Sequence, residues 1–369
     1  MVKPEKSKNN SPVDKNNWRA ICSSIEEECI SCGLCRKECR YLQTYGLPIE
    51  QAKAALDEQL DQGQLFSCSL CGLCTAVCPQ DIDPAAQFAA LRREAVYRNL
   101  GTFKEHNPLT NYEKWGGSKT ISLYDLPDSC DTIFFPGCAL PGTRPKRVEQ
   151  VVETLRQEIP NLGVVLDCCT KPSHDLGRID YFSHAFTRIR GVLLEAGVKK
   201  VLVACPSCFR MFDQYSDGLQ VQTIYEVLTG FDFEAVDLHG EVTVHDPCGV
   251  RDQAQVHKAV RELLVATGLS VVEMKHHGRK TVCCGEGGAV GYLNQEFADT
   301  WTNIRAEEAA GMRIITYCAG CTHFLDRLTP TSHILDLLFE GRKTLAGKVQ
   351  VGRSPFTWLN RLRLKLKLR

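Results

Sequence analysis

The 369-residue sequence lacks any run of about 18 consecutive apolar residues, so it predicts no membrane-spanning helix. Its first twenty residues are polar and contain no apolar stretch that a signal peptide needs. No G-x-G-x-x-G fingerprint follows a predicted strand, so flavin or nicotinamide chemistry is expected on another polypeptide. A haem attachment motif is also missing. Net charge is absent too, with 44 Lys and Arg against 44 Asp and Glu, which argues against nucleic-acid binding.

Cysteine is the residue that the chain has in excess, with twenty copies. In a small secreted protein they would predict disulfides. Here they form tight local groups and no secretion signal precedes them, so they predict metal clusters in a reducing, cytoplasmic environment. The 43% hydrophobic and 24% charged residues are typical of a soluble globular protein with room for two or three domains.

Two ferredoxin-type cysteine runs lie in the N-terminal third. They consist of Cys29, Cys32, Cys35 and Cys39, and of Cys68, Cys71, Cys74 and Cys78. Three thiolates at this spacing hold three corners of a 4Fe-4S cubane, and the fourth cysteine of each run ligates the other cluster. We therefore expect one cubane on Cys29, Cys32, Cys35 and Cys78, and a second on Cys68, Cys71, Cys74 and Cys39. The alternative is a pair of zinc knuckles.

A longer cysteine pattern occurs twice in the C-terminal two-thirds. The first copy is Cys138, Cys168, Cys169, Cys205 and Cys208, and the second is Cys248, Cys283, Cys284, Cys318 and Cys321. Matching members lie 110 (138 to 248) to 115 (169 to 284) positions apart, so the pattern is an internal repeat. Five thiols exceed the four of a tetrahedral zinc site or a cubane, which indicates an unusual iron–sulfur centre. Cys22 and Cys130 match neither pattern and are expected to be plain thiols.

Apolar strands alternate with helices in both copies, and each cysteine group follows a strand. The predicted strands are 131–135, 163–166, 199–204, 241–246, 269–274 and 313–317. The order predicts an α/β fold of two repeated cysteine-rich lobes with parallel sheets, preceded by an α-helical ferredoxin domain. The cysteines would lie at the carboxyl edges of the sheets, where open α/β folds place their ligands.

The chain divides into six predicted segments. They are a disordered N-terminus (1–16), an α-helical ferredoxin domain (17–106) with helices over 48–64 and 84–100, a linker (107–129), a first lobe (130–236), a second lobe (237–345) and a basic tail (346–369). The tail alternates leucine with lysine or arginine from 358 to 369. This alternation places the leucines on one face and the cations on the other only if the chain is an extended strand. It is interpreted as a solvated tail, as a segment that docks on a partner, or as a contact with an anionic membrane surface, which would make the protein peripheral on the inner face of the membrane.

The two five-cysteine sets, the second followed by Gly285, resemble the paired CCG domains of heterodisulfide reductases. With the ferredoxin-like domain in front, the order resembles the fused catalytic subunit of the membrane-linked form, over residues 20–340. The resemblance implies noncubane 4Fe-4S clusters, one or two in number, with a disulfide cleaved between the two sets. Thr170 departs from the pattern because it stands where the second copy has Gly285. Glycine there allows close backbone approach to a cluster.

Two functions follow from this resemblance. The first is an oxidoreductase that reduces a small-molecule or protein disulfide, or oxidises a dithiol, with electrons passing through the ferredoxin domain. The alternative is an electron-transfer subunit that links a flavin dehydrogenase of glycolate, lactate or glycerol 3-phosphate to quinone. A zinc scaffold without enzymatic activity is the remaining interpretation. The expected redox partner is a flavoprotein, a hydrogenase or a cytochrome b subunit.

Three histidines near the cysteines are candidate proton donors to departing thiolates: His174, His245 and His323. The unperturbed pKa of histidine, near 6.5, suits proton transfer at neutral pH. We predict His323 as the catalytic one because it follows Cys321 by two residues. A structural hydrogen-bonding role is the alternative for each.

Overall fold

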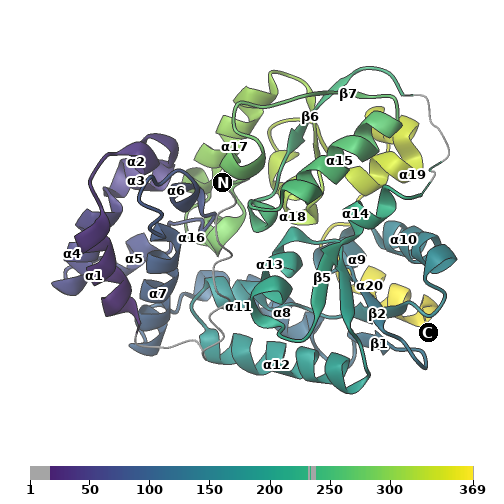
Figure 1. Cartoon of the computed structure of the whole chain (residues 1–369), viewed down its shortest axis with the longest axis horizontal. Coiled ribbons are helices and arrows are strands. Elements are labelled where there is room, and N and C mark those ends of the chain that lie inside the picture. The colour runs from purple at the N-terminus through teal and green to yellow at the C-terminus, as the bar shows by residue number, and fades with distance from the viewer. Residues whose placement is uncertain (1–16, 232, 234–237, 369) are drawn as a thin grey trace.

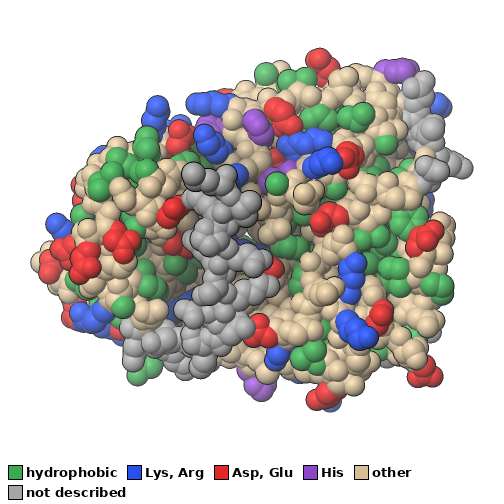
Figure 2. All heavy atoms as spheres, viewed as in Figure 1, with side chains coloured by type: hydrophobic (Ala, Val, Ile, Leu, Met, Phe, Trp, Pro, Cys, Tyr) green, Lys and Arg blue, Asp and Glu red, His purple; other side chains and the backbone are tan. Residues whose placement is uncertain are grey.

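The computed structural model describes residues 17–231, 233 and 238–368, so the predicted N-terminal segment 1–16 lies outside the described residues. A helical N-terminal region lies at one end of the molecule, and two α/β lobes lie beside each other at the other end (Figure 1). On the face in Figure 2, acidic and basic side chains are interspersed, in keeping with the zero net charge. Among the described helices, none combines the length and the apolar character that a bilayer crossing requires.

The N-terminal region is helical, as predicted. Its helices are α1 (Trp18–Glu28), α2 (Leu34–Glu38), α3 (Arg40–Tyr45), α4 (Pro48–Leu56), α5 (Gln62–Leu65), α6 (Leu73–Ala76) and α7 (Pro84–Tyr97). The single helix predicted over 48–64 is wrong. The chain leaves the helix at Asp57, Glu58 takes a left-handed backbone with φ of 60°, and α5 starts again with the Asp61 carboxylate accepting from the Gly63 amide.

The first lobe is built on a five-stranded sheet. Its elements are β1 (Leu123–Asp125), β2 (Thr132–Phe135), α9 (Ala139–Thr143), α10 (Pro145–Glu158), β3 (Gly163–Leu166), α11 (Lys171–Asp175), α12 (Ile179–Glu195), β4 (Lys200–Val203), α13 (Pro206–Tyr215), β5 (Gln220–Thr223) and α14 (Ile224–Leu228). The strand order is β1-β3-β2-β4-β5, and β1 alone is antiparallel to its neighbour. Strands β2 and β3 are buried at every residue, as expected for a parallel sheet covered on both faces.

The second lobe repeats this plan with four parallel strands. Its elements are β6 (Glu241–His245), η2 (Cys248–Val250), α15 (Ala254–Ala266), β7 (Ser270–Val272), η3 (Gly278–Lys280), η4 (Gly287–Ala289), α16 (Val290–Leu293), α17 (Gln295–Ala309), β8 (Arg313–Thr316), α18 (Ala319–Leu325), β9 (Thr331–His333) and α19 (Ile334–Leu345). The order β7-β6-β8-β9 matches β3-β2-β4-β5 of the first lobe. The sequence repeat is therefore a repeat of topology.

This strand order decides where the cysteines meet. In the first lobe the chain runs from β2 to β3 on one side of β2 and then crosses to β4 on the other side. In the second lobe it runs from β6 to β7 and then crosses to β8 in the same way. This change of side leaves a crevice at the carboxyl ends of the strands. In the first lobe, Cys138 follows β2, the pair Cys168-Cys169 follows β3, and Cys205 follows β4. The second lobe repeats this placement after β6, β7 and β8.

Residues 107–129, predicted as a linker, are structured instead. After the short turn η1 (Lys104–His106), helix α8 (Asn107–Gly116) and strand β1 fill most of the segment, and β1 pairs with β3. The carboxylate of the buried Glu113 in α8 accepts bonds from the backbone and the hydroxyl of Ser173 in the first lobe. The linker was predicted from the polar and turn-forming residues of the segment. Its structure depends instead on tertiary contacts with the first lobe.

The predicted basic tail is also folded onto the molecule. Helix α20 (Phe356–Lys367) packs against α9 and α10 of the first lobe (Figure 1). Its buried face contains Arg361 and Lys365, whose nitrogens donate to backbone carbonyls, Arg361 to Gly116 at 2.9 Å and Lys365 to Lys119 at 2.8 Å. Both cations thus lie at the carboxyl end of α8, where the helix dipole favours positive charge. A fully solvated or membrane-facing tail does not describe these two bases.

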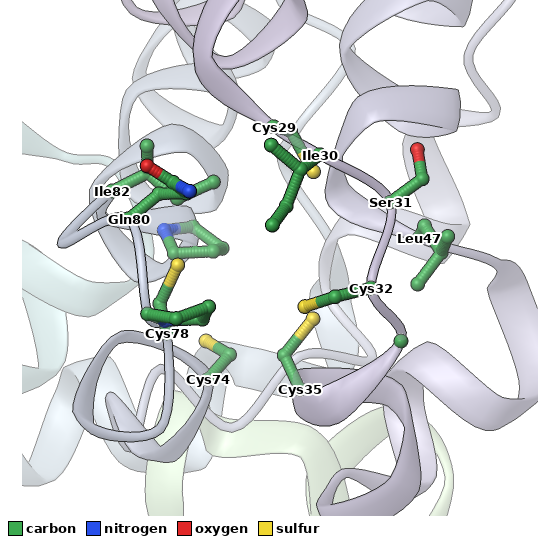
Figure 3. Close-up of a pocket in the computed structure, with 13 residues that line it drawn as sticks. Cys29, Ile30, Ser31, Cys32, Cys35, Leu47, Cys74, Cys78, Gln80 and Ile82 are labelled. Atoms are coloured by element: carbon green, nitrogen blue, oxygen red, sulfur yellow. The ribbon is translucent and has the colours of Figure 1, made fainter.

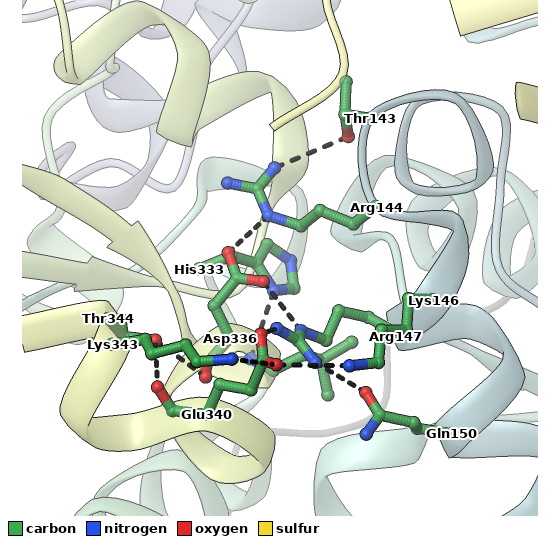
Figure 4. Close-up of polar contacts among 11 residues, drawn as sticks. Thr143, Arg144, Lys146, Arg147, Gln150, His333, Asp336, Glu340, Lys343 and Thr344 are labelled. Atoms are coloured by element: carbon green, nitrogen blue, oxygen red, sulfur yellow. Dashed lines mark hydrogen bonds and ion pairs between the residues drawn. The ribbon is translucent and has the colours of Figure 1, made fainter. Parts of the chain in front are cut away.

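A cross-lobe ion-pair network joins α10 to α19 (Figure 4). Asp336 accepts from Arg144 at 2.6 Å and from Arg147 at 2.9 Å, and the side chains of all three are at most 4% exposed. Arg147 also pairs with Glu340, which lies one turn further along α19. The two lobes are therefore held together by buried, mutually satisfied charges rather than by apolar contact alone.

Candidate functional site: a row of four cysteine groups

The first cysteine group forms a pocket between the two N-terminal runs. Cys32, Cys35 and Cys78 direct their sulfurs into one space that Cys29 also lines (Figure 3). The pocket holds about 370 Å³ of non-atom space, part of it open to solvent. The structure thus brings together the four cysteines that the crossed-ligation rule assigns to one cubane, including Cys78 from the other run.

The second group consists of Cys68, Cys71, Cys74 and Cys39. All four are buried, and Cys39 raises the pKa of Cys74 as Cys68 and Cys71 do, so the four thiols are electrostatic neighbours. Cys74 also borders the first pocket, which places the two groups side by side. Ser31 and Leu70, at the same position of each run, both have left-handed backbones with φ near 50°. The two loops thus curl in the same way around their sulfurs.

The first five-cysteine set forms a connected row of thiols. Cys138 lies beside Cys168, and Cys208 lies beside Cys169 and Cys205. Cys138 and Cys205 are partly exposed, whereas the other three are buried. These two residues of the set therefore reach the protein surface in part.

The second set has the same connectivity. Cys248 lies beside Cys283, Cys283 beside Cys284, Cys284 beside Cys321, and Cys321 beside Cys318. Only Cys248 is partly exposed. The neighbouring Cys283 and Cys321 lower the pKa of Cys284 to about 6.

The two five-cysteine sets touch each other. Cys205 of the first set lies beside Cys318 of the second, close enough that each thiol shifts the pKa of the other. The hydroxyl of Tyr225 lies 2.8 Å from the carbonyl of Ala204 and 3.0 Å from that of Tyr317, the residues just before these two cysteines. Gly249 lies against the backbone of Pro206, where a Cβ would stand 2.5 Å from the carbonyl oxygen. Glycine is needed there so that the carboxyl edges of the two sheets can meet.

The N-terminal groups adjoin the second set. Cys71 raises the pKa of Cys283, and both residues belong to one buried cluster. Gly288 packs so closely on the N-terminal region that a Cβ would stand 2.3 Å from the carbonyl oxygen of Cys68. The four cysteine groups therefore form a row: the first pocket, the second N-terminal group, the second five-cysteine set and the first five-cysteine set.

The chemistry of these thiols suits binding of a positively charged metal centre better than contacts among the thiols themselves. All twenty cysteines are free, and burial raises the pKa of most that shift, Cys35 to about 11 and Cys68 to about 12. So many buried, protonated thiols gain little from their own contacts. Binding of iron would convert them to thiolates and release protons, which couples folding to the metal.

The three histidines have different surroundings. His323 is exposed on α18, and its charged neighbours are Arg327, Arg353, Asp326 and Arg144, so its catalytic role stays a prediction. The ring of His174 is held by Asp175 at 3.1 Å and by the hydroxyl of Tyr215 at 2.8 Å, which is a structural role. His245 is the histidine beside sulfur, within 4.8 Å of Cys284 and Cys321.

Two charged residues at the sets were not singled out from the sequence. Lys171 and Glu286 occupy the same position of the two copies, two residues after the cysteine pair. Desolvation of the carboxyl, together with the thiols of Cys205, Cys138 and Cys248, raises the pKa of Glu286, and Lys171 opposes this shift. The carboxyl of this exposed residue therefore lies near both sets. Comparing the two copies position by position would have found this pair of opposite charges.

Thr170 and Gly285 share a left-handed backbone despite their different side chains. Their φ values are 52° and 105°. A Cβ at Gly285 would stand 2.6 Å from the Thr302 hydroxyl, so only glycine fits there, whereas the first set accommodates threonine. The first set therefore keeps a positive φ at this position with threonine in place of glycine.

Family models match three parts of the chain. A 4Fe-4S dicluster domain matches residues 26–82, and the cysteine-rich CCG domain matches twice, at 132–213 and 242–326. The dicluster domain implies two 4Fe-4S clusters, and CCG domains bind iron–sulfur clusters. These domains and the geometry above define an iron–sulfur protein.

Similarity to individual proteins narrows the class of this protein. The chain is 26% identical to a fumarate reductase (CoM/CoB) subunit of Methanothermobacter marburgensis, over 81% of the chain and 68% of the relative. It is 25% identical to a dihydromethanophenazine:CoB–CoM heterodisulfide reductase subunit of Methanosarcina mazei, over 75% and 82%. It is 24% identical to EtfAB:quinone oxidoreductase of Syntrophomonas wolfei, over 68% of the chain and 39% of the relative. The chain is an iron–sulfur oxidoreductase subunit, distantly homologous to this heterodisulfide reductase subunit.

Proposed function

We propose that the protein reduces a disulfide to two thiols, or oxidises two thiols to a disulfide, at the junction of its two five-cysteine sets. Reduction consumes two electrons and two protons for each disulfide. The electrons come from a redox partner of the flavoprotein, hydrogenase or cytochrome b class. They enter through the two N-terminal clusters, ligated as the crossed sets above.

The observation that carries this proposal is the contact between Cys205 and Cys318. When bound, iron–sulfur clusters supply electrons one at a time, so two adjacent noncubane clusters can together complete a two-electron reaction. A subunit that only transfers electrons needs a series of clusters, but it does not need two clusters that face each other. Here two equivalent sets meet at their sulfurs, which suits a substrate with two sulfur atoms.

The chain's own residues keep this junction selective. The buried members of both sets exclude water, whereas the partly exposed Cys138, Cys205 and Cys248 mark the side from which a substrate approaches. Lys171, which pairs with Asp175, and Glu286 place an ammonium group and a carboxyl group near this junction. They are suited to orient a polar substrate between the two sets.

The alternative is an electron-transfer subunit that passes electrons between a flavin dehydrogenase and quinone. The similarity to EtfAB:quinone oxidoreductase favours this candidate. The retention of all ten thiols, in two complete sets, favours disulfide chemistry.

The test is anaerobic purification, followed by iron and sulfide analysis and electron paramagnetic resonance during titration with thiols and disulfides. A paramagnetic signal from an oxidised cluster that depends on added thiol, together with iron beyond that of two cubanes, supports the proposal. About eight irons per chain, with ferredoxin-type signals alone, would favour the electron-transfer subunit. Zinc in place of iron would overturn both.

A further inference from the structure

His245 lies at the carboxyl end of β6 beside the second cysteine set. One of its ring nitrogens and the sulfurs of Cys284 and Cys321 all lie within 4.8 Å of one another. The side chain is 0% exposed, and neither ring nitrogen has a hydrogen-bond partner among the described residues. Burying polar nitrogens without partners is unfavourable, so a group that binds at the cysteines is the natural partner.

The first lobe has no such histidine. Phe135 stands where His245 does, three residues before the first cysteine of the set, and its ring packs 5.1 Å from that of Phe212. The neighbouring strand differs in the same way, since Phe135 pairs with Val203 and His245 pairs with Thr316. One corner of the repeated site is thus apolar in the first lobe and polar in the second.

The imidazole of His245 can donate a hydrogen bond here. Its ring carries at least one N–H donor in either protonation state. The sulfurs of Cys284 and Cys321 are acceptors that lie close to this donor.

We propose that His245 donates its ring N–H to a sulfur of the cluster held by the second set and raises the reduction potential of that cluster above that of the first. This inference rests on the proposed function, because it requires a cluster at the second set. A hydrogen bond to sulfur stabilises the more negative, reduced state, which shifts the potential upward. The second set adjoins Cys71 of the N-terminal region, so its cluster receives electrons before that of the first set. A higher reduction potential of the second-set cluster favours electrons remaining on it.

The experiment compares the anaerobically purified protein with the variant His245→Phe, which gives the second set the residue of the first. Redox titration followed by electron paramagnetic resonance should show the reduced-to-oxidised ratio of the second-set cluster falling about tenfold at a fixed potential, which is about 59 mV for one electron. In protein labelled with ¹⁵N-histidine, pulsed measurements should detect a weak nitrogen coupling that His245→Phe abolishes. His184→Gln, at an exposed histidine, is the matched control and should change neither quantity.

Two results would overturn the inference. The first is an unchanged potential together with no nitrogen coupling in the unmodified protein. The second is a strong coupling, typical of a direct iron–nitrogen bond. If His245→Phe fails to fold, the coupling in the unmodified protein still decides. Failure of the proposed function has a different signature, because the unmodified protein would then turn over no disulfide or dithiol while the potential shift and the nitrogen coupling remain as expected.

Discussion

Arg92 of the N-terminal region donates a hydrogen bond of 3.0 Å to the carbonyl of Gly288 in the second lobe. The same guanidinium donates to the carbonyls of Leu65 and Cys68 within its own region and to that of Asp175 in the first lobe. Arg92 is 0% exposed, so one buried side chain ties all three regions together beside the cysteine row. The N-terminal cysteine groups are thus fixed relative to the two lobes.

Replacing Arg92 with methionine should lower the free energy of unfolding by about 3 kcal/mol or more, because each buried carbonyl left without a donor costs about 1–3 kcal/mol. Arg98→Met, at a surface ion pair with Glu94, should change it by less than about 1 kcal/mol. Anaerobic thermal unfolding of the two variants makes the comparison. Equal midpoints would show that Arg92 does not join the regions.

Replacing Cys284 or Cys321 with serine should reduce disulfide turnover by about a hundredfold or more, because even partners outside the ligand shell commonly contribute 10–100-fold. The N-terminal clusters should remain reducible by dithionite in both variants. Cys22→Ala, at a buried cysteine outside all four groups, should keep full turnover. Turnover that survives either serine substitution would exclude the second set from the reaction.

Replacing Cys71 with serine should block electron delivery from the physiological donor. Cys71 is the member of the second N-terminal group that lies near Cys283, so its loss interrupts the row of sites. Stopped-flow absorption should show the first N-terminal cluster still reduced while the five-cysteine sets stay oxidised. Delivery at an unchanged rate would mean that electrons reach the sets by another route.

Replacing Asp336 with alanine should destabilise the protein by about 3–5 kcal/mol, since Arg144 and Arg147 would remain buried without their carboxylate. Lys146 belongs to the same network but is 65% exposed, so Lys146→Ala should cost less than about 1 kcal/mol. Chemical unfolding under anaerobic conditions measures both. Similar effects for the two variants would contradict a buried clamp between the lobes.

Exchanging the residues after the cysteine pairs should have unequal effects. Gly285→Thr should destabilise the protein by about 2–4 kcal/mol, from the left-handed backbone and from contact with Thr302. Thr170→Gly should stay within about 1 kcal/mol of the unmodified protein, because relief of backbone strain offsets the added chain entropy. Thermal midpoints and iron content measure the difference, and equal losses would contradict a steric requirement for glycine at the second set alone.

The sequence by itself determined which residues form groups. Cysteine spacing is local, and a repeated strand–helix order fixes the carboxyl edges of parallel sheets, so the helical N-terminal region, the two α/β lobes and the sets of thiols were all predictable. Local sequence rules did not predict the end of the helix near Glu58. A left-handed backbone at this residue ends a helix that the composition favoured.

Only the tertiary structure decided how these groups meet. The contact of Cys205 with Cys318, the burial of Arg361 and Lys365 in a helix, and the choice of His245 over His323 beside the sulfurs depend on surfaces that come together from distant parts of the chain. Spacing along a sequence carries information about neighbours within one strand or turn. It carries none about which buried side chain faces which across an interface between two lobes.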